Sequence, residues 1–208
     1  MPPASTDTRI EIHPHSSYSL LRLVSEDGTN RLTRACVLAL TESLANLASD
    51  PRPLIIAGNQ HFFSAGADLS EIRSLEGPSA YEFAKMGQRL MSTIAHFPPP
   101  VYAAIQGYCM GGGLDLALAC HRRIASPHAI FGHRGAALGL MTGWGGTQRL
   151  PRLVGRARAM EIFVATEKIR AHDALTIGLV NLIAEDPVAA AIREIGRKRV
   201  ALPEQTPS

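Results

Sequence analysis

Apolar residues recur every three or four positions in two stretches of the first half of the chain. This is the spacing of an amphipathic helix, in which about 3.6 residues complete each turn. In residues 31–48 the apolar positions are Leu32, Cys36, Leu40, Leu44 and Leu47, and in residues 79–97 they are Tyr81, Met86, Leu90 and Ile94. Both stretches are predicted to be helices. Shorter helices are predicted over residues 156–165, 171–177 and 187–200.

Short apolar runs lie between the predicted helices and are typical of buried strands. The clearest are residues 54–57 (Leu-Ile-Ile-Ala) and residues 101–105 (Val-Tyr-Ala-Ala-Ile). Further strands are predicted over residues 9–13, 18–24, 121–125, 129–132 and 179–183. Strands and helices alternate along the chain, and no linker or low-complexity segment interrupts them. The pattern therefore predicts the α/β class.

Residues 101–120 form a pattern of strand, tight turn and helix. Gly111, Gly112 and Gly113 stand where the helix begins. The first N–H groups of a helix have no intrahelical acceptor, and the dipole there is positive. Because glycine also allows close approach to the backbone, this point suits a negatively charged or polarised oxygen. Residues 53–69 repeat the pattern, with a strand at 53–57, a turn at 58–60 and small residues that lead into a short helix, so two backbone N–H groups could point at one oxygen.

Three motifs resemble, in order and spacing, those of the crotonase superfamily, which is the enoyl-CoA hydratase/isomerase family. They are residues 63–69 (Phe-Ser-Ala-Gly-Ala-Asp-Leu), Gly107 with Gly111–Gly113, and residues 145–151 (Gly-Gly-Thr-Gln-Arg-Leu-Pro). The resemblance covers roughly residues 8–185 and implies a crotonase-like right-handed spiral of repeated ββα units. It also implies a core domain over residues 1–185, and a shortened C-terminal helix and tail over residues 186–208.

The resemblance further implies an acyl-CoA thioester substrate whose enolate is stabilised by two backbone N–H groups. At the matching positions these donors are Ala65 and Gly112, and Asp115 takes the place of one catalytic Glu. Asp68 is expected to shape the turn at Ala65. The other substrate-binding residues that the resemblance implies are Phe63, Ala67, Leu69, Gly111, Gly135, Leu138 and Gly139. Neither a metal nor a cofactor beyond the coenzyme A of the substrate is expected, and the expected assembly is a homotrimer or a dimer of trimers.

The sequence departs from the family pattern at Gly135, where a second catalytic Glu would fall. Glycine cannot transfer a proton, so the usual pair of carboxylates is incomplete. His133 and Arg134 lie beside this position. His133 could act near neutral pH, or the two residues could bind a carboxylate on the substrate, or they could belong to an ordinary polar loop.

These observations predict a hydratase- or isomerase-like enzyme with an altered proton-transfer set. Two kinds of alternative stay open. One is an isomerase, a dehydratase or a thioester hydrolase that uses Asp115 or His133. The other is a catalytically silent protein of the same fold that binds acyl-CoA or serves as an assembly subunit.

Composition and charge argue against several other classes. A net charge of +3 is too small to indicate a nucleic-acid partner. No apolar run approaches the roughly 18–20 residues of a membrane span, and the N-terminus has no secretion signal. Cys36, Cys109 and Cys120 lie in apolar surroundings without metal-ligand spacing, which is typical of buried thiols in a reducing cytoplasm. The dinucleotide, P-loop and G-x-S-x-G patterns are absent.

Overall fold

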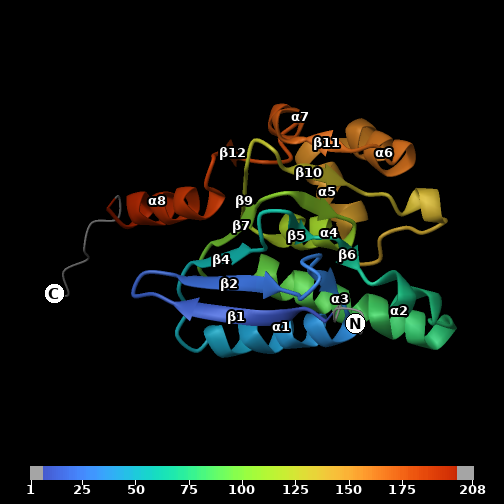
Figure 1. The fold of residues 1–208 in the computed structure, drawn as a ribbon, viewed down its shortest axis with the longest axis horizontal. Coiled ribbons are helices and arrows are strands. Elements are labelled where there is room, and N and C mark those ends of the chain that lie inside the picture. The colour runs from blue at the N-terminus through green and yellow to red at the C-terminus, as the bar shows by residue number, and fades with distance from the viewer. Residues whose placement is uncertain (1–6, 201–208) are drawn as a thin grey trace.

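The computed structural model describes residues 7–200, with side chains as far as Arg197. Figure 1 shows two groups of helices along opposite edges of the view, with most of the strands between them. The lower group includes α1 (Arg34–Leu47) and α3 (Gly77–Ala95), and the upper group includes α6 (Arg156–Ala165) and α7 (Ala171–Thr176), with α5 (Gly146–Val154) further inside the molecule. None of the helices within residues 7–200 is both long and apolar enough to cross a membrane.

Helix α1 begins at Arg34, three residues later than the apolar pattern predicts. Its N-cap is Thr33, whose side chain accepts a hydrogen bond from the N–H of Cys36. The preceding residues form strand β3 (Arg31–Leu32), which pairs in parallel with strand β6 (Gly66–Ala67). A strand of two residues has no periodicity, so the sequence pattern could not separate it from the helix.

Helix α3 forms near its predicted position, but one residue of its predicted apolar face is wrong. Tyr81 is 60% exposed, whereas Phe83 is buried. The two residues are separated by about 200° of helical rotation, so both cannot face the core. The buried face of the helix consists of Phe83, Gly87, Leu90, Met91 and Ile94.

The central sheet has the strand order β1-β2-β4-β7-β9-β12. Strands β1 (Arg9–Pro14) and β2 (Ser19–Val24) form an antiparallel hairpin. The next neighbours pair in parallel, namely β4 (Leu54–Ala57), β7 (Val101–Ile105), β9 (Arg122–Ala125) and β12 (Leu182–Ile183). Strand β12 is shorter than the predicted range 179–183.

A second sheet has the order β11-β10-β8-β5. Its strands are β11 (Ile169–Arg170), β10 (Ile130–Gly132), β8 (Tyr108–Met110) and β5 (Phe62–Ser64). Strands β5, β8 and β10 pair in parallel, and β11 pairs with β10 in the antiparallel sense.

The chain builds the two sheets together in repeated ββα units. Strand β4 is followed by β5 and then by α2 (Leu69–Arg73) and α3, while β7 is followed by β8 and α4 (Gly112–Ala119). Strands β9 and β10 lead in the same way to α5. The predicted α/β class and the repeated unit are therefore confirmed. Since β5 and β8 are neighbours, the segments that follow them also lie close together, which brings Gly66 to Gly112.

Apolar side chains cover both faces of the central sheet, because successive residues of a strand point to opposite faces. On one face Leu21, Ile56 and Ala103 belong to the main core. On the other face Ile55 and Tyr102 belong to a second cluster, together with Ala190, Ala191 and Ile195 of helix α8 (Pro187–Val200). Figure 1 shows α8 at one end of the molecule. The part of the expected tail at residues 201–208 lies outside the described residues.

Candidate active site

A cavity of about 580 Å³ opens beside the start of helix α4. Its wall is formed by β6, by parts of α2, α3 and α4, and by the loop that follows His133. The predicted site residues that line it are Ala65, Ala67, Leu69, Gly111, Gly112, Asp115, Gly135 and Leu138. Three others do not line it: Phe63 is fully buried in the core, Asp68 caps helix α2, and Gly139 follows the short 3₁₀ helix η1 (Ala136–Leu138).

The glycines at the start of α4 allow the helix to begin against the cavity. Gly111 has φ 52°, a conformation that residues with a side chain rarely adopt. Gly112 is packed so closely that a Cβ atom there would lie 2.7 Å from the ring of Trp144 and 3.2 Å from the nitrogen of Ala67. As the first residue of α4, Gly112 presents an N–H without an intrahelical acceptor.

The structure does not favour Ala65 as a donor to a substrate. The N–H of Ala65 donates to the carbonyl oxygen of Thr29 at 2.9 Å, so a ligand would have to displace this bond. The turn is shaped by Ser64, whose hydroxyl donates to Asn30 O at 2.6 Å and accepts from the N–H of Gly66 at 3.1 Å. Asn30 itself has φ 51°. The sequence prediction missed this arrangement because it depends on a residue more than thirty positions away.

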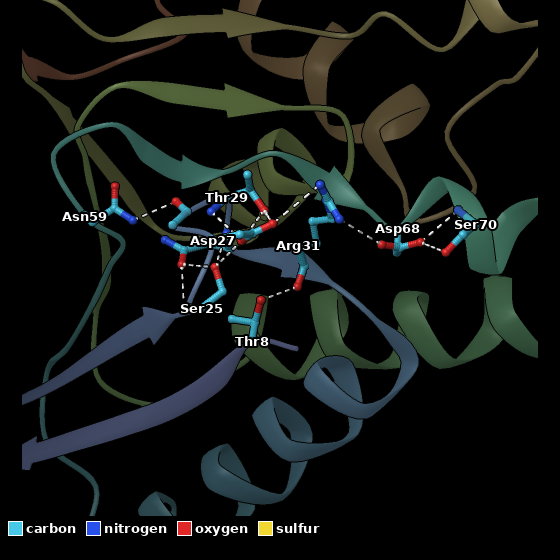
Figure 2. A network of polar contacts seen from close by, with 10 residues as sticks. Thr8, Ser25, Asp27, Thr29, Arg31, Asn59, Asp68 and Ser70 are labelled. Carbon is cyan, nitrogen blue, oxygen red and sulfur yellow. Dashed lines mark hydrogen bonds and ion pairs between the residues drawn. The ribbon is translucent and has the colours of Figure 1, made fainter. Parts of the chain in front are cut away.

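Asp68 holds the N-terminus of helix α2 rather than the turn at Ala65. Its carboxylate accepts hydrogen bonds from the hydroxyl and N–H of Ser70 and from the N–H of Glu71. Figure 2 shows Arg31 between Asp68 and Asp27, with ion-pair distances of 3.6 and 3.5 Å. The hydroxyl bond from Ser70 is the largest of the effects that hold the pKa of Asp68 below its usual value, and the other hydrogen bonds and Arg31 act in the same direction.

Asp115 forms a buried polar cluster at the cavity. Its Oδ1 lies 3.0 Å from Nε2 of His133, and its Oδ2 accepts a short hydrogen bond from the hydroxyl of Thr142. Asp115 and His133 are 1% and 4% exposed, and both contribute to the cavity wall. The ring of His133 also packs against Phe163, with a centroid distance of 5.2 Å.

The cluster depends on Gly146, the first residue of helix α5, because the backbone there lies very close to the side chains of Asp115 and His133. A Cβ atom at this position would lie 2.1 Å from Oδ1 of Asp115 and 3.1 Å from Nε2 of His133. Arg149 is one turn further along α5, and burial lowers its pKa while the nearby charge of Asp115 opposes this shift. Sequence reasoning identified Asp115 and considered His133, but it missed Thr142, which lies in a glycine-rich loop without periodicity.

Gly135 lines the cavity, but its backbone is closely packed. A Cβ atom there would lie 2.8 Å from the carbonyl oxygen of Leu140. The position therefore has no free space in which a glutamate could extend toward Asp115 without a shift of the loop. The side chain that contacts the carboxylate of Asp115 is instead the imidazole of His133.

The thiols are outside this chemistry. Burial raises the pKa of Cys36 and of Cys120 to about 12, and it raises the pKa of Cys109 well above its usual value. A thiol that stays protonated near neutral pH is a poor nucleophile and a poor metal ligand. Within residues 7–200, no cluster of three or more His, Cys, Asp or Glu side chains is arranged to hold a metal ion.

Comparison with known proteins gives a consistent result. The family described as "Enoyl-CoA hydratase/isomerase" matches residues 17–205. A "Probable enoyl-CoA hydratase" of Bacillus subtilis (strain 168) is 44% identical over 160 residues, which is 76% of this chain and 62% of the relative. A "Crotonyl-CoA hydratase" of Syntrophomonas wolfei is 38% identical over 159 residues, which is 75% of this chain and 61% of the relative.

The chain thus spans about three fifths of the length of these curated relatives. Among solved structures, the enoyl-CoA hydratase from Bacillus anthracis superposes with a TM-score of 0.85 at 32% identity, covering 90% of this chain and 75% of that one. These similarities extend over most of the strands and helices that surround the cavity.

Proposed function

The chain belongs to the enoyl-CoA hydratase/isomerase family, and we propose that its cavity binds an enoyl-CoA or acyl-CoA thioester and catalyses enolate chemistry with a single Asp–His pair. The observation that carries this proposal is the buried contact between Asp115 and His133 at the cavity that Gly112, the first residue of helix α4, also lines. The N–H of Gly112 would polarise the thioester carbonyl, and the pair would move the proton at the neighbouring carbon.

Ala67 is the second donor in this proposal, in place of Ala65. The carbonyl oxygen of Arg31 accepts a hydrogen bond from the hydroxyl of Thr8 at 2.6 Å (Figure 2). This carbonyl group therefore points away from β6. Since the N–H and C=O groups of successive strand residues alternate in direction, the bonds between β3 and β6 run through Leu32. The N–H of Ala67 then points away from β3, toward Gly112, which supports its assignment as a donor.

The proton transfer needs only one acid–base unit. With Asp115 ionised, Nε2 of His133 carries the hydrogen that Asp115 accepts, and a neutral ring has its lone pair on Nδ1. His133 removes a proton from the carbon next to the thioester, and the electron pair moves to the carbonyl oxygen, where the N–H groups stabilise it. Asp115 stabilises the resulting imidazolium, which returns the proton to the same carbon or to another one.

Both reactions of the family can use this unit. In isomerisation the imidazole takes a proton from one carbon and returns it to a second, so that the double bond shifts. In hydration a water molecule adds to the β-carbon, its proton passes to His133, and the imidazolium protonates the α-carbon. The enolate is common to both routes, so its formation is the appropriate test.

The test is exchange of the α-protons of butyryl-CoA in heavy water, measured by NMR, together with hydration of crotonyl-CoA followed by the loss of its enone absorbance. We expect exchange, and hydration slower than the roughly 10³ s⁻¹ that marks the upper range of typical enzymes. Binding of acyl-CoA without exchange or hydration would favour the catalytically silent alternative. Absence of binding would overturn the proposal as a whole.

A further inference from the structure

Trp144 is the single tryptophan of the sequence, and it forms part of the cavity wall. It lies in the loop that leads into helix α5 and is only 4% exposed. The sequence pattern gave it no role. Its position, however, places a large rigid ring directly beside the proposed oxyanion site.

The indole ring fits a slot formed by two glycines from two different helices. A Cβ atom at Gly87, in the middle of α3, would lie 2.1 Å from the five-membered part of the ring. A Cβ atom at Gly112, at the start of α4, would lie 2.7 Å from the six-membered part. Any side chain at either position would therefore displace the ring, so the two glycines and the tryptophan form one packing unit.

Two contacts hold the ring in one orientation. Its Nε1–H donates to the carbonyl oxygen of Phe83 at 3.3 Å, and its centroid lies 5.3 Å from that of the Phe83 ring. Phe83 also lines the cavity. A ring that is fixed by a hydrogen bond and by packing on both ends forms a firm wall, which a ligand cannot easily push aside.

This wall restricts where an acyl chain can extend. A thioester carbonyl at the N–H of Gly112 has the Trp144 ring against one side, while the polar pair of Asp115 and His133 occupies another part of the wall. The other large apolar residues of the wall stay accessible to solvent: Leu69, Leu138, Leu140 and Met141 are between 37% and 62% exposed, and Ile72 and Leu75 are half-buried. Carbons beyond the first few of the acyl group would therefore lie along a wall that is open to solvent instead of entering an enclosed apolar channel.

We propose that Trp144 is a specificity-determining residue that restricts tight binding to short acyl-CoA thioesters. The inference rests on the proposed function, because it requires the thioester at Gly112. Each methylene that moves from water into an apolar pocket strengthens binding about fourfold. In the wild type this gain stops once the chain reaches the indole ring, whereas a variant without the ring continues to gain.

The test compares the binding of butyryl-, hexanoyl- and octanoyl-CoA to the wild type and to Trp144→Ala by isothermal titration calorimetry. We expect little gain from butyryl to octanoyl in the wild type, and a relative gain for octanoyl of at least about tenfold in the variant, which corresponds to about two buried methylenes. Apolar cavities made by deleting a large side chain stay dry and accept apolar ligands, which is the behaviour expected here.

Two further variants keep the result decisive. Trp144→Phe retains an aromatic ring of smaller size and should give an intermediate profile, and it decides the question if Trp144→Ala does not fold. Tyr81→Ala removes an exposed aromatic ring from α3 outside the cavity wall, so its profile should equal that of the wild type. An unchanged profile in both Trp144 variants would overturn the inference while the proposed function stands.

The fluorescence of the wild type gives an independent readout, because emission from Trp144 is not mixed with that of any other tryptophan. Butyryl-CoA that occupies the cavity should shift or quench this emission in proportion to the binding seen by calorimetry. Binding without any change in emission would place the acyl group away from Trp144 and overturn the inference. If no acyl-CoA binds to any of these proteins, the proposed function fails together with it.

Discussion

Oδ1 of Asp115 lies 3.0 Å from Nε2 of His133, although the two residues come from different ββα units of the chain. Asp115 is in the first turn of helix α4, and His133 directly follows strand β10. Strands β8 and β10 are parallel neighbours, and this pairing brings the segments that follow them together. A carboxylate and an imidazole thus meet where the family pattern implies two carboxylates.

The first prediction concerns this pair. Asp115→Asn keeps the shape of the side chain but removes its charge, and His133→Gln removes the imidazole. If the two residues act as one unit, each variant should lower the rate of α-proton exchange by about 10²–10⁴-fold. The double variant should be hardly slower than either single variant, since the unit is already lost.

The matched control is Asp50→Asn, which removes a carboxylate that is 74% exposed and paired with Arg52. Its exchange rate should equal that of the wild type. Acyl-CoA binding should persist in the Asp115 and His133 variants. If their effects on exchange simply multiply in the double variant, the two residues act independently, and the proposed unit is wrong.

The longer elements of the fold were predictable because each carries its own periodicity or apolar run. Strands 54–57 and 101–105 and helix 156–165 agree with the structure. Strands β3 and β6 were missed, since two residues cannot show a pattern. The trimeric assembly, the cytoplasmic location and the division of the chain at residue 185 stay predictions.

The site was predictable in part. The glycines before α4 and the buried position of Asp115 follow from local pattern and from the family motif. The hydrogen bond from the N–H of Ala65 to the carbonyl of Thr29 could not be predicted in this way, because Thr29 is followed by Asn30 in a left-handed conformation that the sequence does not reveal. The part of the cavity wall that Trp144 forms could not be predicted either, since it depends on Gly87 and Gly112, which lie 57 and 32 residues before Trp144 in the sequence.

The second prediction concerns Gly135, the position of the missing glutamate. Gly135→Glu should not create a working second carboxylate, because its Cβ would lie 2.8 Å from Leu140 O and the loop would have to shift. Overpacking of this kind typically costs about 1–3 kcal/mol. We expect a lower free energy of unfolding in urea and no gain in crotonyl-CoA hydration, alone or with Asp115→Glu.

Ala136→Glu is the control for this variant, since Ala136 is adjacent and exposed. It adds the same charge to the same loop and should leave the free energy of unfolding nearly unchanged. A Gly135→Glu protein that is as stable as the wild type and hydrates crotonyl-CoA faster would show that the loop adapts easily, contrary to this prediction.

The third prediction concerns the thiols. Burial raises the pKa of Cys36 and Cys120 to about 12, so both remain protonated well above neutral pH. Since the thiolate is the reactive form, the folded protein should not react with Ellman's reagent at pH 8. In denaturing urea all three thiols of the chain should react. Rapid reaction of the folded protein would mean that one thiol is accessible and ionised.

The last prediction concerns Asp68, whose pKa is held below the usual aspartate value of 3.8, chiefly by the hydroxyl of Ser70. A lowered pKa means that the charge stabilises the folded state above the unfolded-state pKa, and that this contribution is lost as the pH falls through the folded-state pKa. Asp68→Asn removes the charge but keeps a good N-cap, so at pH 7 it should destabilise the protein by less than about 1 kcal/mol.

The measurement for Asp68 is the free energy of unfolding in urea between pH 2.5 and 7. The difference between the wild type and Asp68→Asn should be largest at pH 7, should begin to shrink near pH 3.8, and should continue to shrink at lower pH. Asp68→Ala is the control for the cap: it also loses the hydrogen bonds to Ser70 and Glu71, so a deficit of about 1 kcal/mol should persist in acid. A difference between the wild type and Asp68→Asn that stays constant over the whole range would mean that the charge of Asp68 does not stabilise the fold, because only a charge with a lowered pKa gives a contribution that acid removes.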